Sequence, residues 1–310
     1  MSTTVAEPAT AAFPTLPEAG GPPVVERVER PVGGPPREPW TVDQLAGQLK
    51  AMGLATGTTV LVQSSLRRLG ELAEGAETLL KALQQALREV DEEKGTVAAE
   101  GTVVVYTASP ENSDTSRLAR DVTAGMTLEQ EAAHKRVMPP YDPETTPTSR
   151  VLGWFPEFVR LQRGAIRSGH PQTSFAALGP AAEKLMADHR LESHLGPDSP
   201  TQKLYDDPSA RALLIGLPVW CCTAFHLAEY QLPDPPRQVY GCVVSKEDGG
   251  HWEHFNAVKL VDEHFMPMGP VLRSTIAGLR QGRLGDADCW LVPIRAGVDA
   301  ARNYIETRRR

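Results

Sequence analysis

The sequence lacks any long apolar run, and this absence limits the class of protein. No stretch approaches the roughly twenty apolar residues of a membrane span, and the opening residues MSTTVAEPAT have neither a basic start nor an apolar core. We therefore expect neither a membrane span nor a secretory signal. Cysteine is also scarce: the 310 residues include four, without a CxxC pair, at Cys221, Cys222, Cys242 and Cys289. This spacing indicates neither a disulfide framework nor a zinc knuckle, so we expect a reduced, cytoplasmic protein.

Basic residues are outnumbered by acidic ones, which bears on the partners of the protein. Lys and Arg total 32 against 39 Asp and Glu, and the formal net charge is −7. An acidic surface disfavours nucleic acid and tolerates or attracts cationic ligands. We expect a small-molecule partner, with no nucleic acid and no membrane, and we allow for a homodimer.

Proline is concentrated at one end of the chain. Residues 1–39 hold nine of the 27 prolines, together with Gly-Gly pairs at 20–21 and 33–34, and such a composition is a poor core former. We predict a disordered or loosely docked tail over 1–39. The remainder, 40–310, is predicted to be a single domain, because a chain with 41% hydrophobic residues can bury a sizeable core at this length.

Two kinds of apolar pattern alternate from residue 40 onward. Thr41 and Gln44 have the spacing of a capping box, and leucines at 79, 80, 83 and 87 predict an amphipathic helix. The charged segment 91–101 is typical of a loop. Strands are predicted in TTVLVQSS, GTVVVYTAS, SFAALG, ALLIGL, VYGCVVS and DCWLV, and helices near 127–137, 154–163, 180–188, 222–230, 265–280 and 296–308. This alternation predicts an α/β fold with a mixed, mostly parallel sheet covered by helices on both faces.

The stretch RSGHPQTSF contains the first candidate catalytic group. Pro171 biases His170 toward an extended backbone, so the imidazole belongs to a loop or a strand end rather than to a helix. A histidine on a rigid loop is a usual place for a general base, since its reference pKa is about 6.5. The alternative is an ordinary solvated or hydrogen-bonded loop histidine, and the stretch by itself favours that alternative.

The stretch CCTAFHLAEY contains a second candidate. His226 and Glu229 stand at i and i+3 of a predicted helix, on one face. They could form an acid/base dyad or bind a metal, but no third ligand stands at a suitable spacing, so we expect no metal. Glu229 could instead pair with His170 across the fold, and the residues leave this open. A second H-x-x-H, HWEH at 251–254, is expected to be structural or exposed.

Two further segments place hydroxyl groups at turns. The apolar strand predicted in VLVQSSL ends at Ser64. Backbone N–H groups at such a strand end can hold a phosphate, although a serine at this position more usually caps a helix. In SHLGPDSP, Asp198 or Ser199 is expected to cap a helix. A nucleophilic serine enzyme is disfavoured because the GxSxG elbow is absent.

Taken together, these segments resemble one family. The order SSLRRLG, YDPETTP, RSGHPQTSFAALG, LGPDSPTQKL, LLIGLP and TAFHLAE is similar to that of the aminoglycoside 3-N-acetyltransferases, which use acetyl-coenzyme A and are unrelated in fold to the GNAT acetyltransferases. The resemblance covers roughly residues 41–305. The segments TAFHLAEY and LESHLGPDSP resemble those of an actinomycete branch of the family. Members of this branch acetylate small amines in antibiotic biosynthesis, including an aminophosphonate intermediate.

The resemblance implies roles for individual residues. It carries a catalytic histidine onto His170, and a helix-borne histidine and glutamate onto His226 and Glu229. Where members of the family commonly have histidine, this chain has Gln63. By resemblance, the coenzyme lies along Ser64, Ser65, Leu66, Tyr106, Thr107, Thr173 and Ser174, and the amine substrate faces Tyr141, Asp142 and Asp198.

The implied reaction is direct transfer of an acetyl group from acetyl-coenzyme A to a primary amine of an antibiotic or of an antibiotic-biosynthesis intermediate. His170, oriented by a carboxylate such as Glu229, is expected to remove the amine's proton. Hydroxyl or N–H groups near Thr107 or Thr173 are expected to stabilise the oxyanion. One alternative is a Ser/His/Asp thioesterase or hydrolase, which releases coenzyme A without an amine. The other is a non-catalytic binding protein, which releases no thiol.

Overall fold

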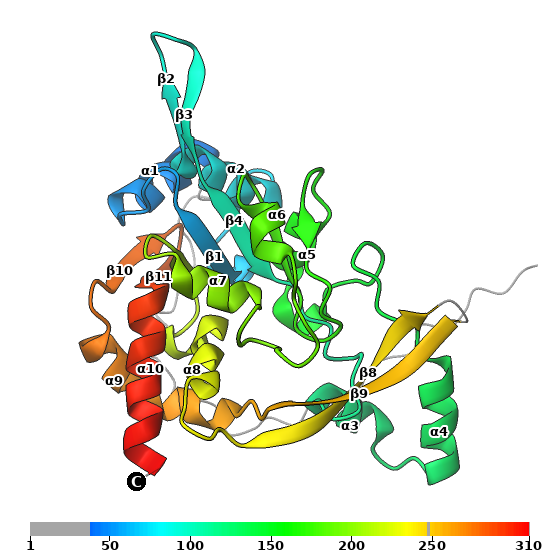
Figure 1. Ribbon diagram of the computed structural model, residues 1–310. Helices are drawn as coiled ribbons and strands as arrows, with labels where there is room; N and C mark the ends of the chain where they lie inside the picture. The colour runs from blue at the N-terminus through cyan, green and yellow to red at the C-terminus, as the bar shows by residue number, and fades with distance from the viewer. Residues whose placement is uncertain (1–37, 247–248, 310) are drawn as a thin grey trace, which may run out of the picture. The chain divides into compact units, whose positions relative to one another are not determined.

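The computed structural model describes residues 38–246 and 249–309 (Figure 1). The tail predicted for 1–39 lies outside these residues up to position 37. Contacts within the chain from Pro39 onward join that part into one unit. Within the described ranges, no helix combines the length and the apolar character needed to cross a membrane.

A seven-stranded mixed sheet forms the centre of the fold. Its order is β10-β11-β7-β1-β4-β6-β5. The three central strands are parallel, with Leu61 on β1 level with Val104 on β4 and with Ala212 on β7, and the outer strands pair antiparallel. The strands are β1 (Thr59–Ser64), β4 (Thr102–Tyr106), β5 (Ile166–Arg167), β6 (Phe175–Leu178), β7 (Arg211–Ile215), β10 (Arg280–Leu284) and β11 (Ala287–Pro293). The predicted α/β fold with a mixed sheet is confirmed, and its parallel pairing is confined to the centre.

Helices cover both faces of the sheet, as predicted. Successive side chains on a strand point to opposite faces, so Val60 and Val62 of β1 join one apolar cluster and Leu61 joins the other. All three are fully buried, which explains the unbroken apolar run of this strand. The first cluster includes residues of α1 (Val42–Ala51), α2 (Ala76–Leu87) and α5 (Trp154–Arg160), and the second includes residues of α6 (Ala182–Met186), α7 (Pro200–Asp206), α8 (Leu227–Tyr230), α9 (Phe265–Thr275) and α10 (Ile294–Arg309).

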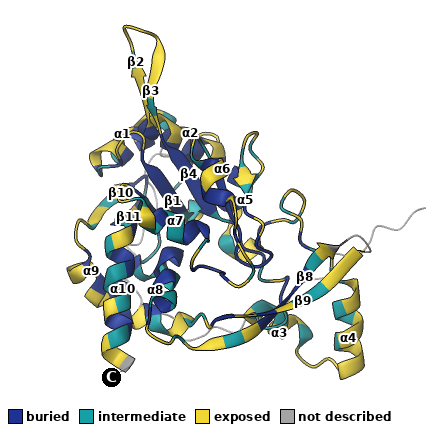
Figure 2. Ribbon diagram, viewed as in Figure 1, coloured by how far each residue is buried: buried dark blue, intermediate teal, exposed yellow. Residues whose placement is uncertain are grey.

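A short exposed hairpin occupies the segment that was expected to be a loop. Strands β2 (Arg88–Asp91) and β3 (Thr96–Glu100) pair antiparallel, and Figure 2 shows that most of their residues are exposed. The turn is closed by Gly95, whose N–H donates to the carbonyl of Asp91 at 2.8 Å and whose φ of +64° suits glycine. The prediction of a loop over 91–101 was therefore wrong, because a hairpin without a buried face carries no apolar alternation to reveal it.

A second hairpin is longer and includes the HWEH segment. Strands β8 (Arg237–Lys246) and β9 (Gly249–Val258) pair antiparallel. The HWEH segment lies on β9, and the side chains of His251 and His254 are 53% and 54% exposed, in line with the expectation of an exposed position. Between them, Trp252 donates its Nε1–H to the carbonyl of Lys135 at 3.0 Å, which ties helix α4 (Leu128–Val137) to the hairpin.

The carboxyl ends of the central strands determine where ligands have access. Because β1, β4 and β7 are parallel, all three end at the same edge of the sheet, where open α/β sheets bind ligands. The chain leaves β4 toward α3 (Arg117–Thr123) and leaves β7 toward α8. The polar segments after these strands are therefore gathered at one edge, while the strands themselves are buried (Figure 2).

The packing of α2 against the sheet gives a test of the core. Leu83 is fully buried in the cluster that covers β1 and β4, so Leu83→Ala is expected to lower the free energy of unfolding by about 2–5 kcal/mol. The neighbouring Gln84 is exposed, and Gln84→Ala is expected to stay within about 0.5 kcal/mol of the wild type. Urea denaturation followed by circular dichroism compares the two, and equal midpoints would contradict this packing.

Candidate active site

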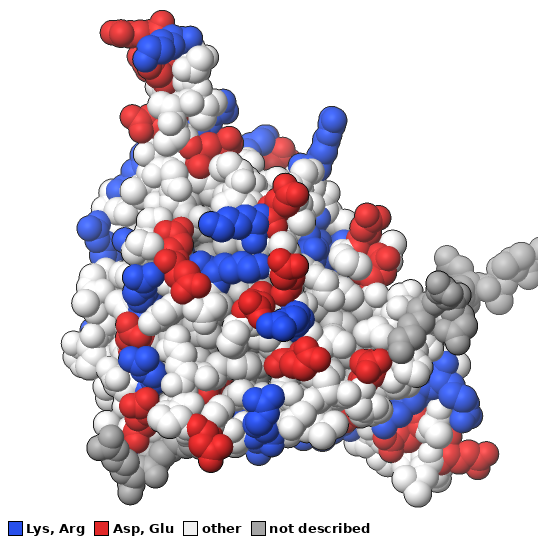
Figure 3. Space-filling model, in the orientation of Figure 1, with Lys and Arg blue, Asp and Glu red and all other residues white. Residues whose placement is uncertain are grey.

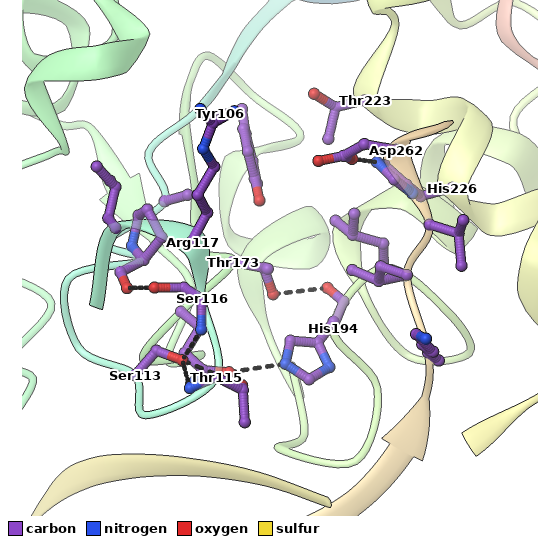
Figure 4. A pocket seen from close by; sticks show the side chains of 18 of the residues that line it. Tyr106, Ser113, Thr115, Ser116, Arg117, Thr173, His194, Thr223, His226 and Asp262 are labelled. Atoms are coloured by element: carbon purple, nitrogen blue, oxygen red, sulfur yellow. Dashed lines mark hydrogen bonds and ion pairs between the residues drawn. The ribbon is translucent and has the colours of Figure 1, made fainter. Parts of the chain in front are cut away.

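A cavity of about 810 Å³ lies beside the carboxyl ends of the parallel strands. Figure 4 shows Arg117 and Ser116 on one side of it and His226 and Asp262 on the opposite side. The residues on its wall come mainly from the end of β4, the start of α3, strand β8, the segments before β6 and before α7, the segment between β7 and α8, and the segment between β9 and α9. Segments that are distant in sequence thus share one water-accessible space.

His226 and Glu229 form a hydrogen-bonded pair at this cavity. The chain runs through a 3-10 turn (Thr223–His226) directly into α8, which places positions i and i+3 on one face. Nδ1 of His226 donates to Glu229 Oε2 at 2.8 Å. The Glu229 side chain is only 3% exposed, and its Oε1 accepts the N–H of Val261 at 2.8 Å. The sequence left open whether Glu229 pairs with His226 or with His170, and in the structure it pairs with His226.

A second carboxylate approaches the other nitrogen of the same ring. Asp262 Oδ1 lies 3.4 Å from His226 Nε2. Burial alone would lower the pKa of His226, but hydrogen bonds to Asp262 and Glu229 and their charges outweigh it and raise the pKa to about 9. The Asp262 side chain is 93% exposed, so water screens its charge, whereas the buried Glu229 is not screened in this way. Sequence reasoning missed Asp262, which belongs to no short motif and reaches His226 only through the fold.

His170, the histidine that the sequence favoured as the base, has the surroundings of a structural residue. It is fully buried, and it is not among the residues on the cavity wall. Its Nδ1 accepts the backbone N–H groups of Gln172 and Thr173 at 3.1 and 3.2 Å, and its Nε2–H donates to the carbonyl of Leu191 at 3.1 Å. Burial, together with His189 and His194, holds its pKa well below the usual value. The ring is neutral and closes the turn that follows Pro171.

Three histidine rings pack together beside the cavity. The ring centroids of His189 and His194 lie 4.8 and 4.7 Å from that of His170. Burial lowers the pKa of His189 to about 4 and that of His194 to about 3. His194 reaches the cavity wall, and its Nε2–H donates to Gln172 Oε1 at 2.7 Å. These partners are uncharged, so nothing in the cluster compensates a proton on any of the three rings.

The residues expected along the coenzyme divide into two groups. Tyr106 and Thr173 lie on the cavity wall, and five others, Ser64, Ser65, Leu66, Thr107 and Ser174, do not. The Thr107 hydroxyl is 3.2 Å from that of Ser174, and the Thr173 hydroxyl donates to the carbonyl of His194 at 2.9 Å. Within the described residues, the Thr107 and Ser174 hydroxyls join the ends of β4 and β6, and the Thr173 hydroxyl joins the segment before β6 to the segment that carries His194.

The residues expected to face the amine have structural partners as well. Tyr141 is buried, and its hydroxyl donates to the carbonyl of Ser168 at 2.7 Å. Asp142 accepts the N–H of Thr145 at 2.7 Å in a turn. Asp198 pairs with Arg190 at the surface, and the helix cap expected there is Ser199. None of the three predicted substrate residues lies on the wall of the cavity.

A partly buried guanidinium holds the Pro-rich joint at 139–147 in place. Arg167 donates to the carbonyl of Thr107 at 2.6 Å and to the carbonyl of Thr146. It also donates to the hydroxyl of Ser174 at 3.0 Å and stacks over the ring of Tyr141, 5.1 Å from its centroid. Burial lowers the pKa of Arg167. This joint is therefore a rigid part of the scaffold.

Gln63 and Thr223 form a clamp that the sequence did not indicate. Gln63 Nε2 donates to Thr223 Oγ1 at 3.0 Å and to the carbonyl of Cys221 at 3.1 Å. Its Oε1 accepts the N–H of Thr223 at 2.9 Å. The end of β1 is thereby joined to the turn that carries His226. Thr223 lies on the cavity wall, and no described residue accepts its hydroxyl proton.

Charge is unevenly distributed over the cavity wall. Arg117 and Arg120 come from α3, whereas Asp262 and Glu263 come from the segment before α9, which also carries Lys259. Figure 4 places Arg117 across the cavity from Asp262. On the outer face drawn in Figure 3, by contrast, acidic and basic side chains are interspersed. No group of three metal-binding side chains occurs among residues 38–246 and 249–309.

Comparisons with known proteins point to one family. A family model described as Aminoglycoside 3-N-acetyltransferase matches residues 61–306. The aminoglycoside N(3')-acetyltransferase-like protein YokD of Bacillus subtilis is 32% identical over 267 residues, 86% of this chain and 93% of the relative. Its crystal structure covers 87% of this chain and 94% of its own, with a TM-score of 0.77.

Two other relatives extend this comparison. Aminoglycoside N(3)-acetyltransferase VIII of Streptomyces fradiae is 31% identical over 296 residues, 91% of this chain and 96% of the relative. The structure of AAC-IIIb in a binary complex with CoASH is 28% identical, with a TM-score of 0.72, and covers 87% of this chain and 98% of its own.

The buried histidine cluster predicts a loss of stability in acid. A histidine whose folded pKa lies below its unfolded value of about 6.5 contributes stability above that value, and the contribution is lost as the pH falls toward the folded pKa. Together, three such groups contribute at most about 4 kcal/mol per pH unit to the slope of the unfolding free energy against pH. His194→Phe is expected to reduce this slope by about 1.4 kcal/mol per pH unit. Urea titrations between pH 6 and pH 4.5 measure it.

The exposed His251 supplies the control for the acid experiment. His251→Gln changes a histidine on β9 whose side chain is 53% exposed, so the slope is expected to match that of the wild type. The interpretation would be excluded by equal slopes for wild type and His194→Phe.

Proposed function

Because the chain belongs to the aminoglycoside 3-N-acetyltransferase family, and is therefore an acetyl-coenzyme A-dependent N-acetyltransferase, we propose that it acetylates a primary amine of an antibiotic or of an antibiotic-biosynthesis intermediate, with His226 as the general base. The observation that carries this proposal is that His226, on the cavity wall, is hydrogen-bonded to the buried Glu229. Two related structures, AAC-IIIb with CoASH and AAC-VIa with sisomicin, support a coenzyme donor and an amine acceptor.

His226 has the geometry of an oriented base. Its Nδ1–H is engaged by Glu229, which assigns the lone pair to Nε2 in the neutral ring. Nε2 faces the exposed Asp262 rather than a backbone carbonyl. His170 offers no comparable nitrogen, because both of its ring nitrogens are bonded to the backbone. The proposal therefore moves the base from His170 to His226 and keeps Glu229 as the orienting carboxylate.

The transfer requires no covalent enzyme intermediate. Nε2 of His226 accepts a proton from the amine as the amine nitrogen attacks the acetyl carbonyl carbon of acetyl-coenzyme A. The C–N bond forms, the tetrahedral intermediate collapses, and the C–S bond breaks. The departing thiolate takes the proton from the imidazolium, which returns His226 to its neutral form. Glu229 stabilises the imidazolium while it exists.

Thr223 is suited to stabilise the oxyanion of that intermediate. Its Oγ1 accepts the amide N–H of Gln63, so its own proton is directed away from the clamp and is available to a ligand. This assignment takes the place of the groups near Thr107 and Thr173, because those hydroxyls are engaged within the scaffold. Gln63 is thus a positioning residue for Thr223.

The coenzyme and the amine differ in charge, and we assign them to different parts of the wall. The phosphates of coenzyme A carry negative charge and suit the side with Arg117 and Arg120. An amine that is cationic at neutral pH suits the side with Asp262 and Glu263.

We also propose a cytoplasmic location and a homodimer. Cell fractionation tests the location, and light scattering tests the oligomeric state.

Replacing the two histidines in the same way tests which one is the base. His226→Asn retains an N–H toward Glu229 but removes the proton acceptor, so we expect turnover to fall about 10²–10⁴-fold. His170→Asn is expected to lower the melting temperature while turnover per folded molecule stays within about fivefold of the wild type. Thiol release with acetyl-coenzyme A and a panel of amines, corrected for folded fraction, gives both values.

Two results would overturn this assignment. A His226→Asn variant with wild-type turnover would remove His226 as the base. Release of coenzyme A at the full rate without any amine would instead favour a hydrolase.

Replacing Thr223 tests the oxyanion contact. Thr223→Val keeps the shape of the side chain and removes one donor, so kcat is expected to fall about 10²–10³-fold, with little change in KM for acetyl-coenzyme A. Thr115 also lies on the cavity wall, and its hydroxyl is paired with that of Ser113. Thr115→Val is therefore expected to stay within about threefold of wild-type kcat. Steady-state kinetics compares the variants, and equal kcat values would refute the contact.

A further inference from the structure

We propose that Asp262 binds the ammonium group of the acceptor substrate and holds its nitrogen next to Nε2 of His226. This inference rests on the proposed function, because it assigns the subsite that delivers the amine to the proposed base. It concerns a residue that carries no sequence motif and that approaches the reacting nitrogen from outside the His226–Glu229 pair.

The first argument is the position of the Asp262 carboxylate. Oδ1 lies 3.4 Å from His226 Nε2, so a cation bound to this carboxylate lies near the nitrogen that must accept its proton. The side chain is 93% exposed, and it lies on the wall of the cavity. His226 is its sole hydrogen-bond or ion-pair partner within the described residues. The carboxylate thus retains oxygen lone pairs for a ligand.

The second argument is that the backbone at Asp262 is fixed. The preceding residue, Val261, donates its N–H to the buried Glu229, and the carbonyl of Asp262 accepts the N–H of Phe265. The ring of Phe265 meets that of His226 edge-on, with centroids 4.5 Å apart. An exposed carboxylate on a fixed backbone loses less conformational freedom on binding a ligand than one on a mobile loop.

The third argument is electrostatic. Figure 4 shows Asp262 across the cavity from Arg117, and Glu263 adds a second negative charge on the same segment. Lys259 is the cation on that segment, and no ion pair joins it to Asp262 within the described residues. The side of the cavity next to His226 therefore carries carboxylates that complement an ammonium group, whereas the phosphates of the donor are drawn to α3.

Asp262 also has a role in the loss of protons from the acceptor nitrogen. An ammonium nitrogen must lose two protons before it becomes an amide nitrogen. One passes to water at the exposed Asp262, and the other passes to Nε2 of His226 and then to the thiolate sulfur. An ammonium on Asp262 also compensates the charge that stabilises a proton on His226, so binding of the acceptor releases the base for its task.

Variants at Asp262 and at an acidic position outside the cavity test the subsite. Asp262→Asn removes the charge and keeps the shape, and KM for the amine is expected to rise at least tenfold while KM for acetyl-coenzyme A stays within twofold. Asp262→Glu keeps the charge and is expected to recover KM for the amine to within about threefold. Glu129→Gln removes an exposed carboxylate on α4 that lies outside the cavity wall, and its effect is expected to be below threefold.

The probes are sisomicin and 2-aminoethylphosphonate, assayed by thiol release with the full-length protein. A tenfold rise in KM for whichever probe the wild type acetylates, recovered by Asp262→Glu, supports the subsite. An unchanged KM for the amine in Asp262→Asn overturns it, and so does an equal rise in KM for acetyl-coenzyme A. If the wild type acetylates neither probe, the proposed acceptor class fails and the subsite fails with it. If Asp262→Asn is unfolded by circular dichroism, Asp262→Ser in the same assay decides by the same criteria.

Discussion

The buried carboxylate of Glu229 is the interaction on which the site depends. It is 3% exposed and accepts two hydrogen bonds of 2.8 Å, one from Nδ1 of His226 and one from the N–H of Val261. The first bond is local, and the second reaches across 32 positions of the chain. A carboxylate buried without partners costs several kcal/mol, so both segments are held where they satisfy it. The orientation of the His226 ring and the placement of Asp262 therefore have one cause.

The histidines show how partners, rather than burial, set the protonation state. Burial lowers the pKa of His194 to about 3, because the partner of its ring is the neutral amide of Gln172. Burial acts in the same direction on His226, yet two carboxylates raise its pKa to about 9. The same side chain thus serves as a neutral core residue in one place and as a proton-binding group in another, within one cavity wall.

The sequence predicted those features that depend on residues close together in the chain. The i, i+3 spacing predicts the pair of His226 and Glu229, because one helical turn is enough to join them, and the capping box at Thr41 is confirmed for the same reason. For His170, Pro171 indicates a turn but not where the N–H groups of that turn point, and two of them point onto the imidazole. Asp262 was missed because the β8–β9 hairpin and the fold, rather than a motif, bring it to His226.

The electrostatics that hold the site together also favour the proposed reaction. Since the folded pKa of His226 lies above its unfolded value of about 6.5, its pairing with Asp262 and Glu229 contributes stability that is fully present below that value and is lost as the pH rises through about 9. A neutral His226 is thus the less favoured form beside a buried carboxylate. In the proposed reaction, the imidazolium that forms when the amine gives up its proton regains this interaction in full. The ion pair that stabilises the fold is therefore recovered when the amine is deprotonated, which lowers the free energy of that step.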